Sequence, residues 1–169
     1  MLKRVVVNMR TERWDVDVSP FDTPAEKLSV ALASLDRGTA EVEQTQAAFS
    51  ARLRLMPDVF SLSYDESEES GMAGTQTQVV FHPGSRSRVC MTRSGGVRTS
   101  LVFERGVRHE SEYQTPIMPF EVCVCALRVD NGLGLGQNGI DGTLEVDYLV
   151  QLRGAQSQLC RMRVDVREE

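Results

Sequence analysis

The sequence predicts a single all-β, mainly antiparallel domain that closes into an up-and-down barrel. Three observations lead to this fold. Apolar runs recur about every ten residues from residue 49 onward, Gly- or Pro-containing turns separate them, and no helical pattern lies between them. Closing such a strand series into a barrel removes its exposed edges. The 169 residues suffice for one buried core, so we expect one domain over 1–169, with 15–48 as an inserted helix and linker.

The first strand is predicted over residues 2–14, which carry three consecutive valines at 5–7 and then polar residues at alternate places. The next element is a helix over 24–36. Thr23 and Glu26 form a capping box around a proline, and Leu28, Leu32 and Leu35 form an apolar stripe. Residues 39–48 are polar and are predicted to be weakly helical at best.

The remaining strands follow from alternation and turn residues. Residues 105–106 and 153–154 indicate tight hairpins, and residues 130–142, with five glycines, indicate a loop. The predicted strands span 49–55, 59–66, 75–82, 88–93, 97–104, 107–115, 120–129, 143–152 and 158–166.

Strand alternation also assigns side chains to the barrel interior, which is mainly aliphatic and aromatic. Successive strands run in opposite directions, so the end of one lies beside the start of the next. This topology gathers the inward polar residues at one mouth of the barrel, above an apolar floor of Phe60, Phe81, Val89 and Phe103, and such a mouth is typical of a ligand pocket. The candidate ligand-binding residues are Arg93, Glu66, Tyr64, Thr75, Tyr113 and Thr115, with Thr99 also near this mouth.

Arg93 and Glu66 have two interpretations at this stage. An inward arginine in a small barrel often pairs with an inward carboxylate only to neutralise both charges. The same pair could also contact a ligand, and an anionic one would suit the arginine fork. We expect the two side chains to lie within contact range in either case.

Four cysteines, at 90, 123, 125 and 160, are expected to be reduced thiols, since no export signal is seen. Cys123, Cys125 and Leu127 make the outer face of their strand too apolar to face water. We therefore predict that the helix at 24–36 docks on that face, or that it forms a contact with a second copy of the chain.

No pattern of catalytic or metal-binding residues emerges. The Cys-x-Cys pair has no second pair at zinc-binding spacing, the run of glycines at 132–136 lacks the Lys-Ser/Thr ending of a phosphate loop, and no nucleophile elbow occurs. We expect no cofactor, no metal and no enzymatic activity. The net charge of −5 argues against nucleic-acid and membrane surfaces, and the expected location is cytoplasmic.

Four segments together resemble the DUF1934 family, the YwiB-like uncharacterised bacterial proteins. The resemblance covers the chain from about residue 50 to the end, excludes the segment with the helix, and implies a calycin-like (lipocalin-like) β-barrel without an assigned activity. The segments are Val59-Phe60-Ser61-Leu62-Ser63-Tyr64-Asp65-Glu66, Met91-Thr92-Arg93-Ser94-Gly95, Glu112-Tyr113-Gln114-Thr115-Pro116 and Gly142-Thr143-Leu144-Glu145-Val146-Asp147-Tyr148.

The sequence therefore leaves two functions. One is a non-enzymatic binding module that holds a small, partly apolar or anionic ligand in the barrel. The other is a structural or interaction protein that acts through a homodimer or a protein partner, with the helix and the acidic segment 65–70 as its contact surface.

Overall fold

The computed structural model describes residues 1–33, 42–68, 72–81, 88–136 and 139–169. Within them it contains one helix, α1, over Ala25–Ala33, and otherwise β-strands. The strands are β1 Leu2–Val16, β2 Val42–Met56, β3 Val59–Asp65, β4 Thr75–Phe81, β5 Arg88–Gly95, β6 Thr99–Glu104, β7 Arg108–Gln114, β8 Pro119–Asn131, β9 Gly134–Gly136, β10 Gly139–Leu152 and β11 Ser157–Glu168.

Ten of these strands form one antiparallel sheet in the order β6-β5-β4-β3-β2-β1-β11-β10-β8-β7, and β9 pairs only with β10. Successive strands of this series therefore pair with one another, except β6 and β7, which are the two ends of the order. The first and last strands join the series into a ring, through a ladder that runs from Val5↔Glu168 to Val16↔Ser157. The predicted all-β, up-and-down antiparallel architecture is confirmed.

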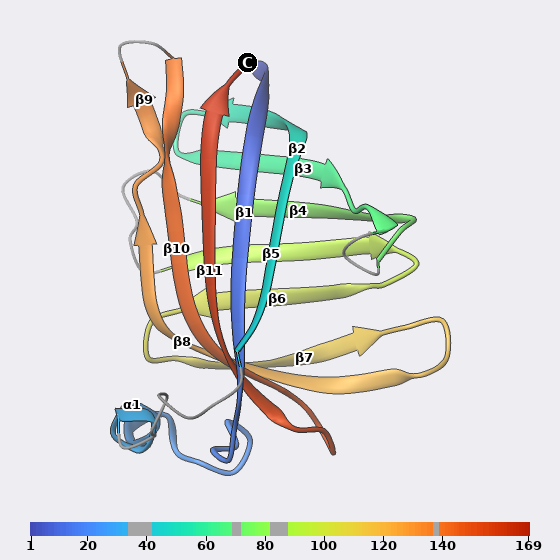
Figure 1. Ribbon diagram of the computed structural model, residues 1–169, viewed down its shortest axis with the longest axis vertical. Helices are drawn as coiled ribbons and strands as arrows, with labels where there is room; N and C mark the ends of the chain where they lie inside the picture. The colour runs from blue at the N-terminus through green and yellow to red at the C-terminus, as the bar shows by residue number, and fades with distance from the viewer. Residues whose placement is uncertain (34–41, 69–71, 82–87, 137–138) are drawn as a thin grey trace.

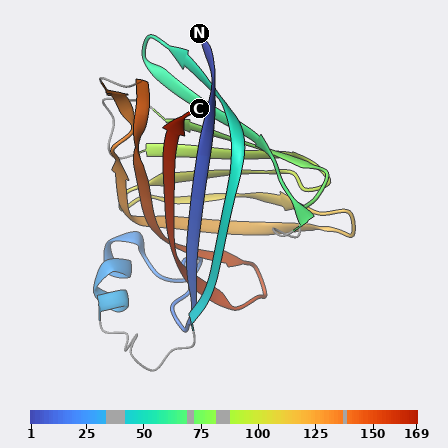
Figure 2. The same cartoon turned by 45° about the horizontal axis from the view of Figure 1, so that its top comes forward.

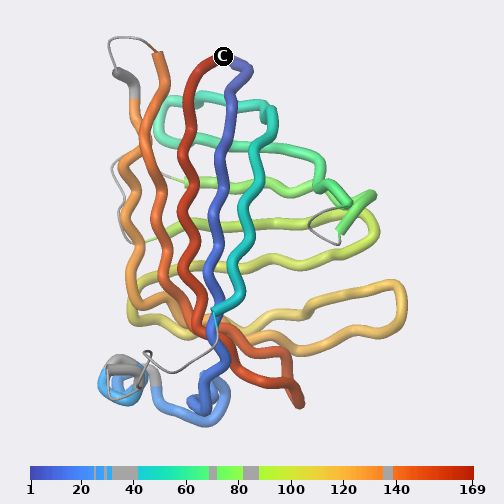
Figure 3. The backbone as a smooth tube through the Cα atoms, viewed as in Figure 1, coloured from blue at the N-terminus to red at the C-terminus, as the bar shows by residue number. Residues whose placement is uncertain are grey.

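The long strands and the short ones lie in two layers that cross at a steep angle (Figure 1). β1, β2, β10 and β11 run together along the molecule, and β3 to β7 run across them. β2 belongs to both layers, because its last residues, Arg52–Met56, also pair with β3 (Figure 3). The two chain ends lie close together at one end of the long layer (Figure 2).

The ring is nearly closed, and its weakest seam lies between β6 and β7. Two backbone hydrogen bonds between Arg98 and Gln114 form the bridge there, and Ser111 Oγ adds a bond to the Ser100 carbonyl. The predicted turn at 105–106 exists, since Val107 N donates to the Glu104 carbonyl at 3.0 Å and Gly106 has a positive φ. The tight hairpin predicted from it is incomplete, because no continuous ladder follows between the described strands.

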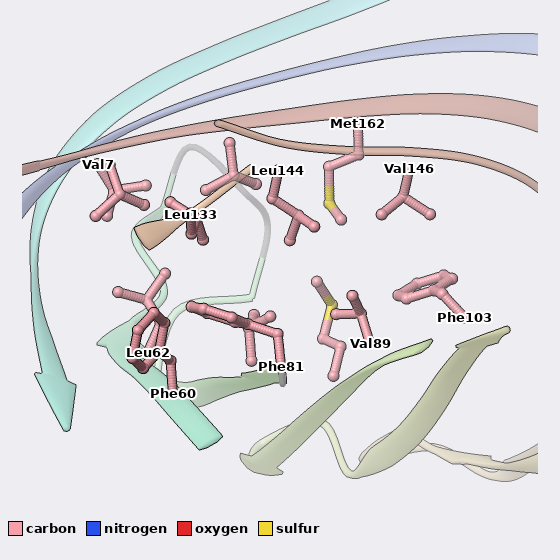
Figure 4. Packing of buried hydrophobic residues seen from close by; sticks show 14 of the residues in the cluster. Val7, Phe60, Leu62, Phe81, Val89, Phe103, Leu133, Leu144, Val146 and Met162 are labelled. Carbon is pink, nitrogen blue, oxygen red and sulfur yellow. The ribbon is translucent and has the colours of Figure 1, made fainter. Parts of the chain in front are cut away.

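The barrel interior is filled by apolar side chains from both layers, which face each other across the barrel (Figure 4). Val7, Leu144 and Met162 come from the long strands, and Phe81 and Phe103 come from the crossing strands. The four residues predicted as the apolar floor are all buried, and the Phe60 and Phe81 rings meet edge to face at 5.2 Å. The inward assignment from alternation is confirmed for this core.

A second, smaller core lies outside the barrel, where α1 packs. Leu28 is fully buried in it together with Trp14, Cys125, Leu149 and Leu159. The prediction that the helix docks on the outer face of the Cys125 strand is confirmed, and the docking is within one chain. Leu35 lies outside the described residues, and the side chain of Leu32 is not described.

Two segments differ from the predictions. Residues 42–48, predicted to be weakly helical at best, are part of β2, because β1 pairs with them continuously from Trp14↔Val42 onward. The loop predicted over 130–142 contains β9 and the start of β10, which pair through Gly136↔Gly139. The ladder with a neighbouring strand, rather than local hydrophobicity, organises both segments.

Gly142 is expected to be the most sensitive glycine of the barrel. Its φ is +137°, and a Cβ there would collide with the Gly132 carbonyl oxygen and lie 2.9 Å from Leu133 Cα. We expect Gly142→Ala to lower the free energy of unfolding by about 3 kcal/mol. Gly154→Ala, at a positive φ but with no atom within 4 Å, should cost about 1 kcal/mol. Urea denaturation of both variants checks this, and equal losses would contradict it.

Candidate functional site at the barrel mouth

A row of inward polar side chains crosses the strands at the mouth of the barrel, where β3, β5 and β7 end and β4 and β6 begin. The register places Tyr64 opposite Thr77, Thr77 opposite Arg93, and Arg93 opposite Thr99. Tyr113 comes next across the seam, since its neighbour Gln114 bridges to Arg98. Directly opposed side chains on one face are close enough to interact.

Glu66 follows β3 and turns its carboxylate into this row. Thr77 Oγ1 donates a hydrogen bond of 2.6 Å to Glu66 Oε1, and the Glu66 backbone N donates to the Thr75 carbonyl. Arg93 Nε lies 3.9 Å from the same carboxylate oxygen, with 16% of the Arg93 side chain and 9% of the Glu66 side chain exposed. The predicted contact between Arg93 and Glu66 is confirmed, and it is an ion pair without a hydrogen bond.

Two buried donors of the row have no acceptor. Arg93 Nε and Thr99 Oγ1 are both inaccessible to solvent, and neither makes a hydrogen bond to any described residue. They sit on directly opposed residues of β5 and β6. Leaving a buried donor unpaired costs about 1–3 kcal/mol, so an oxygen from outside the protein would stabilise this pair once the side chains that cover the two donors move aside.

Tyr64 closes the row on the side of β2. Its ring is buried and packs at a tilt of 38° against the half-buried Phe49 ring, with the centroids 4.4 Å apart. Burial, and then the negative charge of Glu66, raise the pKa of the Tyr64 hydroxyl well above its usual range. The tyrosine therefore stays neutral and acts as an aromatic wall with a polar edge.

The other predicted site residues have different roles. Thr75 is buried, but its hydroxyl accepts a hydrogen bond from Val97 N, so it holds the turn between β5 and β6. Thr115 Oγ1 accepts hydrogen bonds from Ile117 N and Met118 N and donates one to the Met118 carbonyl. The Thr115 hydroxyl is therefore engaged within the turn between β7 and β8. Tyr113 packs, half-buried, against the core. In the described part of the chain neither Tyr113 nor Thr115 hydrogen-bonds to Glu66 or Arg93.

Two residues that the structure brings into the site were not among the predicted site residues. Thr77 alternates with outward Gln76 and Gln78, so the sequence already placed it inward, but nothing marked it as the partner of Glu66. Thr99 was placed near the mouth, yet its pairing with Arg93 depends on the register of β5 and β6. That register is a property of the assembled sheet.

Among the described residues, no set of three or more His, Cys, Asp or Glu side chains is arranged to hold a metal ion. No helix among these residues has the length and apolar character needed to cross a membrane.

Comparison with known proteins defines the family. The model for the domain of unknown function DUF1934 matches residues 32–164, which is most of the chain. The chain belongs to the DUF1934 family. The DUF1934 match begins earlier than the resemblance seen in the sequence, and it takes in the end of α1 and all of β2. No curated protein sequence matches the chain.

The DUF1934 chain is also similar in structure to the ywiB protein from Bacillus subtilis, whose crystal structure aligns with a TM-score of 0.67. The alignment covers 99% of this chain and 93% of the ywiB chain, at 15% sequence identity. At this identity the likeness concerns the fold, and it extends the shared barrel to both ends of the chain.

Proposed function

We propose that this chain is a non-enzymatic binding module whose barrel mouth holds a small ligand with an anionic head and an apolar body. The observation that carries the proposal is the pair of buried, unpartnered donors, Arg93 Nε and Thr99 Oγ1. A carboxylate or phosphate oxygen would accept from both, and a guanidinium favours such oxyanions. The half-buried Phe49 and Tyr113 rings offer apolar surface for the rest of the ligand.

Glu66 shapes the specificity of this site. Its carboxylate already accepts a hydrogen bond from Thr77 and lies near Arg93, so it partly neutralises the positive charge that Arg93 presents to a ligand. A ligand with one negative charge is therefore favoured over a highly charged one, because a second charge would face Glu66. A calycin-like ligand-binding role is consistent with this arrangement.

A matched pair of probes tests the proposal: octanoate, and octanol as the same chain without the charge. We expect octanoate to raise the melting temperature of the protein increasingly as its concentration exceeds the dissociation constant, by about 2–4 °C for each kcal/mol added to the free energy of unfolding, and octanol to have no comparable effect. Differential scanning fluorimetry measures the shift, and native mass spectrometry of gently purified protein identifies any ligand already bound.

Thr99→Val removes the donor without changing the shape of the side chain, and it should reduce the octanoate shift. Thr92→Val is the matched control, since Thr92 is an exposed, outward residue beside Arg93 on β5. Equal shifts for octanoate and octanol, or no shift with either at millimolar concentration, would count against an anionic site at the mouth.

The alternative function is an interaction protein that acts through a homodimer or a protein partner, and one observation that favoured it no longer does. The helix that was expected to offer a contact surface buries Leu28 against its own barrel. Light scattering separates the two functions: a concentration-independent monomer favours the binding module.

A further inference from the structure

A groove of about 610 Å³ lies on the outer side of the barrel, where β2 and β3 separate. The two strands pair up to Arg52↔Ser63, and beyond that pair Ser50 of β2 and Asp65 of β3 line the groove from opposite sides. Gln76 and Gln78 of β4 extend it. Its volume falls in the range of small-molecule sites, and the Arg93–Thr99 donors do not line it, although Tyr64 of the mouth row does.

Three arginines converge on this groove, and the strand register explains why. Arg4 of β1 is directly opposite Arg52 of β2, and Arg54 lies on the same face two residues further along. All three line the groove and are exposed. Like charges directly opposite each other on a sheet are destabilising, so the arrangement costs the protein free energy when the groove is empty.

The charge of these arginines is not neutralised by ion pairs within the described residues. Elsewhere on the outer face the pattern differs: Arg128 and Arg163 both pair with Glu145. Two carboxylates, those of Asp65 and Glu169, do line the groove, but neither forms an ion pair with the arginines in the described chain. Among the side chains that line the groove, three guanidiniums therefore face two carboxylates, in a protein with a net charge of −5.

We propose that the groove is a second binding site, for a small molecule that carries at least two linked phosphate groups. Guanidinium groups bind phosphate oxygens through paired hydrogen bonds, and three of them match a ligand with more than one phosphate. Ser63 and Gln78, directly opposite each other on β3 and β4, add neutral hydrogen-bonding groups beside Arg52. The proposal is independent of the ligand at the barrel mouth.

Pyrophosphate is the probe, with orthophosphate as the single-phosphate comparison. In isothermal titration calorimetry at low salt, we expect pyrophosphate to bind at least about tenfold more tightly than orthophosphate, and to weaken as salt is added. Arg52→Gln should weaken pyrophosphate binding at least tenfold. Arg10→Gln is the matched control, because Arg10 is exposed on the same face of β1 but outside the groove, and it should change binding less than twofold.

A stability measurement separates a binding role from a structural one. Without ligand, Arg52→Gln should raise the melting temperature at low salt, since it relieves the repulsion between Arg4 and Arg52. With pyrophosphate the order should reverse, because only the unmodified protein gains stability from the ligand. The proposal is overturned if pyrophosphate at about 10 mM, roughly tenfold above a dissociation constant of about 1 mM, gives no heat. It is also overturned if Arg10→Gln weakens binding as much as Arg52→Gln, or if Arg52→Gln destabilises the free protein.

Discussion

Arg93→Ala is expected to lower the free energy of unfolding by about 3 kcal/mol, because it leaves the Glu66 carboxylate without its countercharge at a site where only 9% of that side chain is exposed. Thr77 still donates to Glu66 in this variant, which keeps the loss at the lower end of the range for broken buried ion pairs. Urea denaturation followed by circular dichroism measures the change.

A double-mutant cycle shows whether the loss comes from the stranded carboxylate. Glu66→Gln keeps an acceptor for Thr77 and removes the charge, so Arg93→Ala should cost much less in the Glu66→Gln background than in the unmodified protein. If Arg93→Ala costs the same in both backgrounds, the ion pair does not stabilise the mouth, and the packing of the Arg93 side chain explains the loss.

The mouth could be predicted from the sequence because it depends on two simple properties of strands. Alternation decides which side chains point inward, and an up-and-down order brings the end of one strand beside the start of the next. Glu66 and Arg93 were placed together by these properties alone. Their ion pair in the structure shows that faces and strand ends were assigned correctly in β3 to β5.

The parts that the sequence did not predict depend on pairing over long distances. The first half of β2 has no alternation to detect, since most of its side chains are exposed on both faces. It is a strand because β1 supplies a continuous ladder. The unpaired state of Arg93 Nε and Thr99 Oγ1 depends in the same way on the β5–β6 register, which short turns alone do not determine.

Thr115 shows a different limit of the alternation argument. Its position in the strand pattern pointed to the mouth, but its hydroxyl is engaged with Ile117 and Met118 in the next turn. The hydroxyl of a threonine immediately before a turn readily forms hydrogen bonds to backbone groups two or three residues away, and these local bonds compete with more distant partners. The Thr-Pro-Ile-Met-Pro segment, with its two prolines, indicates such a turn, but strand alternation alone takes no account of turns.

The second large effect is expected on the reactivity of Cys123 and Cys125 when α1 is displaced. Both thiols are buried on the outer side of β8, and Cys125 lies in the same apolar cluster as Leu28. The segment before the helix is also anchored to this face, since Arg108 Nη1 donates to the Pro20 and Phe21 carbonyls.

Burial raises the pKa of Cys123 to about 11 and also raises that of Cys125. In the native protein at pH 8 both should therefore label slowly, and faster as the pH approaches 11, because the thiolate is the reactive form.

Leu28→Glu should release the helix and expose these thiols. Losing the burial of a leucine removes about 3 kcal/mol of docking free energy, which enlarges the open population by roughly a hundredfold. Once solvated, the two thiols regain lower pKa values, so labelling at pH 8 accelerates further.

Val30→Glu is the matched control, because Val30 lies on the same helix with 73% of its surface exposed. Cys160, buried with the barrel strands, should stay protected in both variants. Mass spectrometry of a thiol-labelling time course reads each cysteine separately. Labelling of Cys123 and Cys125 in the unmodified protein as fast as that of half-exposed Cys90 would show that α1 does not cover them in solution.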